Sequence, residues 1–209
     1  MKNIFVTGIG TDVGKTVVSA VLVRALGACY WKPVQAGASD EREVISLAGI
    51  NPERSFSPTY DLNTPCSPHA AAKIDGVKIE LEDFTLPDCE DRIIVEGAGG
   101  LHVPLNYRTL IIDLIKHLEL PVVLVSRQYL GSINHTLLSI EALKSRKINL
   151  LGVVFVGEQN RESEEAILKF GQTKVLFHLP VLDPLTPESC QSFADKNKEL
   201  INERLAEHR

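Results

Sequence analysis

A glycine-rich stretch near the amino terminus constrains the fold of this chain more than any other part of its sequence. Residues 8–16 read Gly-Ile-Gly-Thr-Asp-Val-Gly-Lys-Thr and follow a short β-branched run, residues 3–7. In residues 17–26 the apolar side chains recur at helical spacing. The sequence therefore predicts a strand, a tight glycine turn and a helix in direct succession.

A turn of this kind is suited to binding phosphate. The first N–H groups of a helix lack partners within the helix, and the helix dipole is positive at that end. Glycines let the backbone approach an anion, Lys15 would reach the β- and γ-phosphates, and the Thr16 hydroxyl would bind Mg²⁺. The usual pattern has four residues between its first glycine and the Gly-Lys-Thr. Here five residues separate Gly8 from Gly14, and Ile9 stands where the first glycine is expected. Despite this departure, the stretch predicts a nucleoside triphosphate site.

Two further strand ends carry charged side chains. Residues 28–31 predict a second strand, which Lys32 follows directly, and residues 92–95 predict a core strand that ends at Glu96 and a glycine-rich turn. Ligands of open α/β sheets bind beyond the carboxyl ends of the strands, so Lys32 and Glu96 would face the same crevice as Lys15. There Glu96 would bind Mg²⁺, directly or through water. The alternatives are an exposed loop lysine and a glycine turn with an incidental glutamate.

Between these strands the sequence predicts a short helix and an insertion. A helix is predicted over residues 41–48, with Ser39 or Asp40 as its cap. Asp40 could be only that cap or could also bind Mg²⁺, and its spacing favours the cap alone. Residues 51–87 are rich in proline, serine and threonine and weakly periodic. They read as an insertion beside the site, with a helix that starts at Ser67 and Pro68.

The rest of the chain alternates between buried strands and amphipathic helices. Strands are predicted over residues 121–125, 150–156 and 175–179, and helices over residues 109–118, 133–145, 162–170 and 197–207. This alternation predicts an α/β fold with a doubly wound, mostly parallel sheet flanked by helices, similar to phosphate-loop NTPases. A length of 209 residues favours one domain, residues 1–209.

Composition excludes some classes of partner and compartment. The net charge of −5 gives no overall attraction to nucleic acid or to an anionic membrane. No signal-peptide pattern opens the sequence and no apolar run approaches the roughly 20 residues that span a bilayer, so a cytoplasmic protein is expected. The cysteines, Cys29, Cys66, Cys89 and Cys190, form no Cys-x-x-Cys pair and are predicted to be buried, reduced thiols.

Five segments, taken together and in order, resemble the dethiobiotin synthetases, ATP-dependent enzymes of biotin biosynthesis. The segments are residues 8–16, Lys32-Pro33-Val34, Ser67-Pro68-His69, residues 96–100 and residues 130–135. The resemblance spans nearly the whole chain and implies a homodimeric cyclo-ligase. Its reaction converts 7,8-diaminononanoate, CO₂ and MgATP to dethiobiotin, ADP and phosphate, through a carbamate and a mixed carbamic-phosphoric anhydride.

The resemblance also implies roles for individual residues. Lys15 and Lys32 would neutralise the carbamate and the γ-phosphate, and Thr11 would donate a hydrogen bond to the carbamate. The Mg²⁺ ligands would be Thr16, Asp40 and Glu96. The nucleotide contacts would be Asp12, Val13, Gly14, Lys15, Thr16, Val17, Asp40, Glu96, Gly97, Ala98, Gly99, Pro180, Val181 and Leu182. The substrate contacts would be Lys32, Ala36 and Ser67, with Gly131, Ser132 and Asn134 receiving the substrate carboxylate across the dimer interface.

The sequence departs from this family's pattern at three positions. Asp12 stands where a glutamate is usual, and Ala36 where many members carry a serine or threonine. Val156 stands where the family commonly has an asparagine that reads the adenine edge. Loss of a buried hydrogen-bond pair reduces base discrimination by about 1–3 kcal/mol, so we expect loose nucleotide selectivity.

Two other readings share the predicted fold. A partitioning-type ATPase switch generally carries a second lysine early in the phosphate loop, and residues 8–14 contain none. A nucleotide-binding module without catalysis would bind ATP but would not turn it over when given a diamine.

Overall fold

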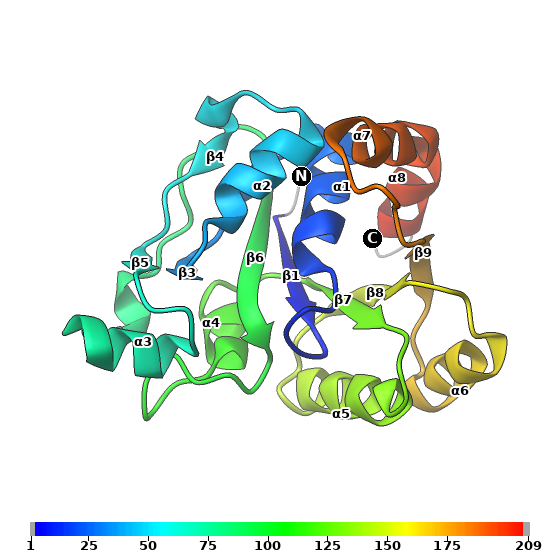
Figure 1. The fold of residues 1–209 in the computed structure, drawn as a ribbon. Coiled ribbons are helices and arrows are strands. Elements are labelled where there is room, and N and C mark those ends of the chain that lie inside the picture. The colour runs from blue at the N-terminus through cyan, green and yellow to red at the C-terminus, as the bar shows by residue number, and fades with distance from the viewer. Residues whose placement is uncertain (1–2, 207–209) are drawn as a thin grey trace.

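A computed structural model describes residues 3–206 of the chain, in which seven strands form one central sheet (Figure 1). From edge to edge these are β4 (Ser55–Phe56), β2 (Cys29–Trp31), β6 (Ile93–Gly100), β1 (Ile4–Gly8), β7 (Val122–Arg127), β8 (Leu150–Val156) and β9 (Val175–Leu179). Neighbouring strands pair in parallel throughout. Because β1 lies in the middle, the loop after it opens at the centre of the carboxyl edge.

Helices cover both faces of this sheet (Figure 1). One face carries α1 (Lys15–Leu26), α2 (Asp40–Ala48), α7 (Pro187–Lys196) and α8 (Lys198–Ala206), and the other carries α4 (Ile111–His117), α5 (Ser132–Ser145) and α6 (Arg161–Gly171). Side chains alternate across β1, so that Ile4 and Val6 join the core beneath α1 while Phe5 joins the core beneath α4. The predicted doubly wound α/β fold is confirmed.

The predicted insertion contains more regular structure than its sequence indicates. Its short strand β5 (Tyr60–Leu62) pairs in parallel with β3 (Val34–Ala36), and β4 extends the main sheet. It also holds α3 (Pro68–Asp75) and two 3-10 turns, η1 (Pro52–Arg54) and η2 (Leu81–Asp83). Strands of two or three residues are too short to show a period, so the sequence does not reveal them.

The sequence prediction misplaces the end of one strand and omits one helix. β6 does not end in a glycine turn at Glu96 but continues through Gly100, which pairs with Gly8. A Cβ atom on Gly97 would lie 2.7 Å from the Phe5 ring, so this glycine makes room for a side chain within the sheet. The sequence reading also missed α7, which begins at Pro187 with Thr186 as its cap. The predicted last helix ended at Glu207, which lies outside the described residues.

The prediction of four buried cysteines is wrong for two of them. Cys29 and Cys190 are buried, whereas Cys66 is exposed and Cys89 is half-buried. The reason is position, because Cys66 and Cys89 lie in loops and the other two lie in β2 and α7. No helix within residues 3–206 combines the length and apolar character needed to cross a bilayer.

Candidate active site

The loop after β1 depends on residues with left-handed backbone. Asp12 has a φ of 57° and Gly14 a φ of 93°, and α1 begins directly after Gly14. A Cβ atom on Gly14 would lie 3.2 Å from the side chain of Val156, at the end of β8. Only glycine meets both demands without strain. The loop therefore brings bare backbone to the amino end of α1, where an anion is stabilised.

A cavity of about 740 Å³ opens where β1, β2 and β6 approach the carboxyl edge of the sheet. The predicted site residues that line it are Thr11, Asp12, Gly14, Lys15, Thr16, Val17, Lys32, Ala36, Asp40, Ser67, Glu96, Ala98 and Gly99. Other lining residues are Gln35, Ala38, Glu43, Pro65, Cys66, Pro68, Val103 and Arg127. The insertion thus lies beside the site, as predicted. The volume falls within the range of small-molecule sites.

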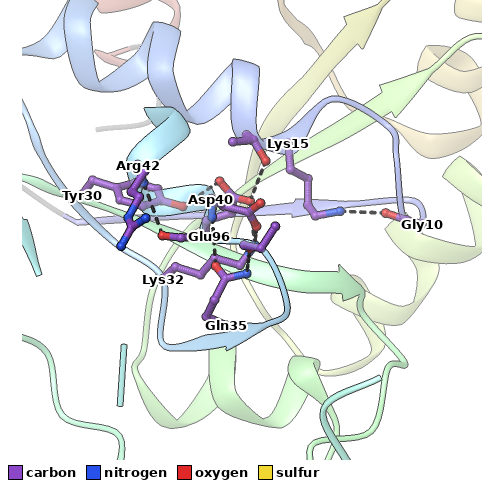
Figure 2. Close-up of polar contacts among 11 residues, drawn as sticks. Gly10, Lys15, Tyr30, Lys32, Gln35, Asp40, Arg42 and Glu96 are labelled. Carbon is purple, nitrogen blue, oxygen red and sulfur yellow. Dashed lines mark hydrogen bonds and ion pairs between the residues drawn. The ribbon is translucent and has the colours of Figure 1, made fainter. Parts of the chain in front are cut away.

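A buried lysine joins two carboxylates in this cavity (Figure 2). The Lys32 ammonium lies 3.2 Å from Oε1 of Glu96 and forms an ion pair with Asp40. Lys32 is 6% exposed and Glu96 only 1%. Charges so deeply buried are tolerated only when they are paired, which accounts for the close grouping.

The phosphate-loop lysine lies beside this cluster. The ammonium of Lys15 donates to the Gly10 carbonyl at 2.9 Å (Figure 2), and only 7% of the residue is exposed. Burial lowers the pKa of Lys15 to about 8; Glu96 opposes this shift and Lys32 adds to it. Among residues 3–206 no carboxylate forms an ion pair with this ammonium, so it is a strong binding point for an incoming phosphate.

The oxygen ligands available in the cavity suit Mg²⁺. Thr16 donates its hydroxyl to Oε1 of Glu96 at 3.2 Å, the oxygen that Lys32 also contacts. A hydroxyl and two carboxylates are hard ligands of the kind that Mg²⁺ prefers. Within residues 3–206 no three His, Cys, Asp or Glu side chains converge to hold a metal. Mg²⁺ takes one or two carboxylates and completes its shell with phosphate and water.

Several proteins that carry one enzyme name are similar in sequence to this chain along almost its whole length. The ATP-dependent dethiobiotin synthetase BioD of Afipia carboxidovorans is 52% identical over 194 residues, 91% of this chain and 92% of that protein. The enzyme of the same name from Christiangramia forsetii is 53% identical over 84% of this chain and 86% of its own. The chain belongs to the dethiobiotin synthetase family. A broader profile, described as AAA domain, matches residues 2–189.

Solved structures of ATPases share the fold of this dethiobiotin synthetase family member. A ParA family ATPase from Chlorobium tepidum matches with a TM-score of 0.58 over 98% of this chain and 96% of its own, at 14% identity. The cell division ATPase MinD of Pyrococcus furiosus matches with a TM-score of 0.57 over the full length of both chains, also at 14% identity. At this identity the likeness concerns the fold alone, and it confirms the predicted phosphate-loop ATPase architecture.

The sequence reading missed Tyr30, which holds the second oxygen of Glu96. Tyr30 is fully buried, and its hydroxyl donates to Oε2 of Glu96 at 3.1 Å (Figure 2). Burial, with the charge of Glu96, raises the pKa of Tyr30 well above its ordinary value, so the phenol remains a donor. A signal was present in the sequence, because Tyr30 precedes Lys32 by two residues and side chains at that spacing share one face of a strand.

Gln35 is a second residue that the sequence reading missed. Its amide donates to the Ala38 carbonyl, and its Oε1 accepts the Asp40 N–H at 3.1 Å (Figure 2). The helix cap is Ser39, whose hydroxyl oxygen accepts the Arg42 N–H at 3.4 Å. Asp40 is therefore the first residue of α2 and not its cap, and its carboxylate points toward Lys32.

Arg127 is a third cavity residue without a predicted role. It ends β7, and its Nη1 donates to the Asp12 carbonyl at 3.1 Å. Arg127 thus braces the tip of the phosphate loop from the neighbouring strand and adds a positive charge to the cavity rim.

The residues predicted to contact the base follow β9 and do not line the cavity. Pro180, Val181 and Leu182 follow β9, whose last residue pairs with Val156. The side chain of Val156 lies over Gly14 of the phosphate loop. Val156 therefore stands between that loop and the chain segment that follows β9. Two other predicted contacts pack inward, since Val13 is buried in the core and Gly97 lies against Phe5.

The residues predicted to receive the substrate carboxylate lie at the start of α5. Gly131 precedes the helix with a φ of 103°, Ser132 is buried and Asn134 is exposed. They do not line the large cavity. A smaller hollow of about 290 Å³ lies between α5 and the phosphate loop, and it shares Thr11 with the cavity. The roles of these residues stay predictions.

Proposed function

We propose that this chain is an ATP-dependent dethiobiotin synthetase that closes a cyclic urea on 7,8-diaminononanoate, with release of ADP and phosphate. The observation that carries the proposal is the meeting of Lys15, Lys32 and Glu96 in one cavity beside a phosphate loop. The proposal is also supported by relatives that are named dethiobiotin synthetases. They are about half identical to this chain over nine-tenths of its length.

The chemistry requires charge neutralisation more than a covalent catalyst. CO₂ and one amine of the substrate give a carbamate, whose oxygen must be phosphorylated before the second amine can displace phosphate and close the ring. Carbamate and γ-phosphate are both anionic, and phosphoryl transfer between them depends on positioning and electrostatic stabilisation. Lys15 and Lys32 would hold the two anions from opposite sides, and Thr11 would donate to the carbamate.

Thr16, Asp40 and Glu96 would hold Mg²⁺. When bound, this ion neutralises charge on the phosphates. Lys32 forms ion pairs with both Asp40 and Glu96. If these two carboxylates also bound a metal ion, they would hold Lys32 less strongly, and its ammonium would be available to bind the carbamate. The buried position of the cluster excludes water, which protects a mixed anhydride from hydrolysis.

We further propose a homodimer in which the start of α5 receives the substrate carboxylate from the partner's site. Support comes from apolar side chains exposed on and before this helix, namely Leu130, Ile133 and Leu138. They flank Gly131 and Asn134, and such patches commonly mark protein interfaces. A second copy covering them would bring these polar groups to a neighbouring cavity.

A cytoplasmic location is part of the proposal, since the reaction consumes ATP and CO₂. No nucleic-acid or membrane partner is proposed, because a net charge of −5 opposes general attraction to polyanions.

The first experiment measures phosphate release by the purified protein with MgATP and bicarbonate, with and without 7,8-diaminononanoate, and detects dethiobiotin by mass. We expect phosphate release that depends on the diamine and matches the dethiobiotin formed. Lys15→Ala and Lys32→Ala should each lower turnover by at least 10²-fold, the cost of losing one charge-stabilising group. Lys169→Ala, on an exposed face of α6, is the matched control.

If the rate of phosphate release were the same with and without the diamine, the proposal would be wrong. That result would favour the partitioning-type switch, against which the lysine-free stretch of residues 8–14 counts. ATP binding with no turnover in any mixture would favour a binding module.

A further inference from the structure

Two cysteines far apart in the sequence meet at the sheet end opposite the cavity. The sulfur atoms of Cys29 and Cys89 lie 2.7 Å apart, and both residues are free thiols. A disulfide bond is about 2.0 Å long, so a small approach of the two sulfurs suffices to form one.

The backbone holds this pair in place. Cys29 is the first residue of β2 and pairs with Ile93, the first residue of β6. The Cys29 N–H donates to the Arg92 carbonyl at 2.7 Å, which anchors the end of the loop that carries Cys89. The two thiols are thus neighbours because adjacent parallel strands begin there.

The other two cysteines have no such neighbour. Cys190 lies in α7, within the core on the opposite face of the sheet, and Cys66 is exposed before α3. Their positions make them internal controls for any reaction that needs two adjacent thiols.

We propose that Cys29 and Cys89 form a dithiol site that a hydroperoxide oxidises to an intramolecular disulfide. Cys89 is half-exposed and meets the oxidant first, whereas Cys29 is only 4% exposed. Burial and the neighbouring thiol raise the pKa of Cys29 to about 12, so Cys29 does not react with solvent oxidants by itself.

The reaction balances with one peroxide. The Cys89 thiol gives up its proton, its sulfur attacks a peroxide oxygen and the O–O bond breaks, so that a sulfenic acid forms and the leaving hydroxide takes that proton to become water. The Cys29 sulfur then attacks the Cys89 sulfur, the S–O bond breaks, and the leaving hydroxide takes the Cys29 proton to give a second water. Two thiols and one H₂O₂ thus yield one disulfide and two waters.

The bond would close a loop that carries nearly half of the residues lining the candidate site. Residues 30–88 lie between the two cysteines and carry α2, α3, Lys32 and Asp40. A cross-link across a loop of this length restricts the unfolded chain and stabilises the fold. Because the pair lies at the strand ends away from the cavity, we infer a stabilising bond and not an inhibitory one.

Peptide mapping tests this inference directly, because trypsin places the four cysteines in different peptides. Cys29 falls in residues 25–42, Cys66 in 55–73, Cys89 in 79–92 and Cys190 in 175–196. After treatment with hydrogen peroxide and blocking of free thiols, we expect peptide 25–42 linked to peptide 79–92, with two hydrogen atoms lost. Dithiothreitol should release both. The melting temperature of the oxidised protein should exceed that of the reduced protein by roughly 5–10 °C.

Variants separate the cross-link from other oxidation. Cys89→Ser should abolish both the linked peptide and the rise in melting temperature, whereas Cys66→Ser should keep both. Phenylarsine oxide, which bridges adjacent thiols without oxidising them, should bind one per wild-type chain and none per Cys89→Ser chain. The proposal fails if peroxide takes Cys89 to a sulfinic acid while Cys29 stays free. It fails equally if either cysteine links to Cys66, to Cys190 or to another chain.

Discussion

At the scale of single residues, the candidate site is a group of charged side chains joined by ion pairs and hydrogen bonds. Glu96 accepts from Thr16 in α1, from Tyr30 in β2 and from Lys32, which directly follows β2. A carboxylate so enclosed has its orientation set by its donors, which matters for any cation that is to share it. Tyr30 is the donor that no ligand would replace, since it binds the oxygen that faces the core.

Tyr30→Phe should weaken metal binding with little change in fold. The substitution keeps the ring and leaves Oε2 of Glu96 without its donor, a loss of about 1–3 kcal/mol for a buried charged group. We expect Mn²⁺ in the presence of ADP to bind about 5- to 150-fold more weakly, as measured by electron paramagnetic resonance. Tyr60→Phe, whose hydroxyl contacts Asp83, is the control. Unchanged Mn²⁺ affinity in Tyr30→Phe would show that Tyr30 serves only the core.

Val156→Asn should sharpen nucleotide selectivity. Val156 lies at the end of β8 over Gly14, beside the segment predicted to contact the base. An amide there adds a donor and an acceptor that distinguish adenine from other bases, worth about 1–3 kcal/mol. The ratio of kcat/KM for ATP to that for GTP or CTP should rise about tenfold. Val156→Thr, which has no amide, should leave the ratio as in the wild type. An equal rise in both variants would show that the amide does not cause the selectivity.

At the scale of elements, the helices on one face are joined by polar contacts at their exposed ends. Arg24 in α1 donates through Nε and Nη2 to both carboxylate oxygens of Asp195 in α7, each at 2.9 Å. This pair attaches the helix that the sequence reading missed to the helix that carries the phosphate loop. Surface ion pairs add little stability, and two-bond arginine pairs are among the more effective.

Asp195→Asn should therefore lower stability slightly, in a pH-dependent way. The hydrogen bond from Arg24 lowers the pKa of Asp195 below its ordinary value of 3.8. Such a group stabilises the fold above its unfolded pKa and loses that effect as the pH falls through its folded pKa. Urea unfolding should show wild type above Asp195→Asn at neutral pH and no difference once the carboxyl is protonated. A difference that persists in acid would point to helix propensity instead.

At the scale of the whole molecule, the proposed homodimer would have a second copy of the chain supply one side of the site. Leu130 is fully exposed and lies one residue before Gly131, in a sequence segment typical of the family. Leucine at such a position is costly in water unless another surface covers it. Assembly and substrate binding are therefore expected to depend on the same segment.

Leu130→Asp should separate the two copies. Light scattering of the wild-type protein should give twice the mass of one chain, and the variant should give the mass of one. Diamine-dependent phosphate release should fall while binding of ADP is retained, because the phosphate loop belongs to a single chain. Phe170→Asp, at another exposed apolar position, on α6, should change neither property. A monomeric wild-type protein with full activity would overturn the shared site.

The sequence by itself determined the fold class, the phosphate loop and two charged residues of the site, Lys32 directly after β2 and Glu96 within β6. These features are local, since an unbroken apolar strand, a glycine turn and a helical period can each be read within about ten residues. The family resemblance rested on several such segments in a fixed order, and close relatives confirmed it.

Only the tertiary structure decided which residues share an environment. Lys32 and Glu96 are 64 positions apart, Thr16 and Glu96 are 80 apart, and Cys29 and Cys89 are 60 apart. Each pair meets because β6 lies between β1 and β2 in the sheet. Strand order depends on how whole elements bury their apolar faces, and no local pattern encodes it. The roles of Tyr30, the Asp40 carboxylate and the adjacent thiols therefore emerge only once the sheet is assembled.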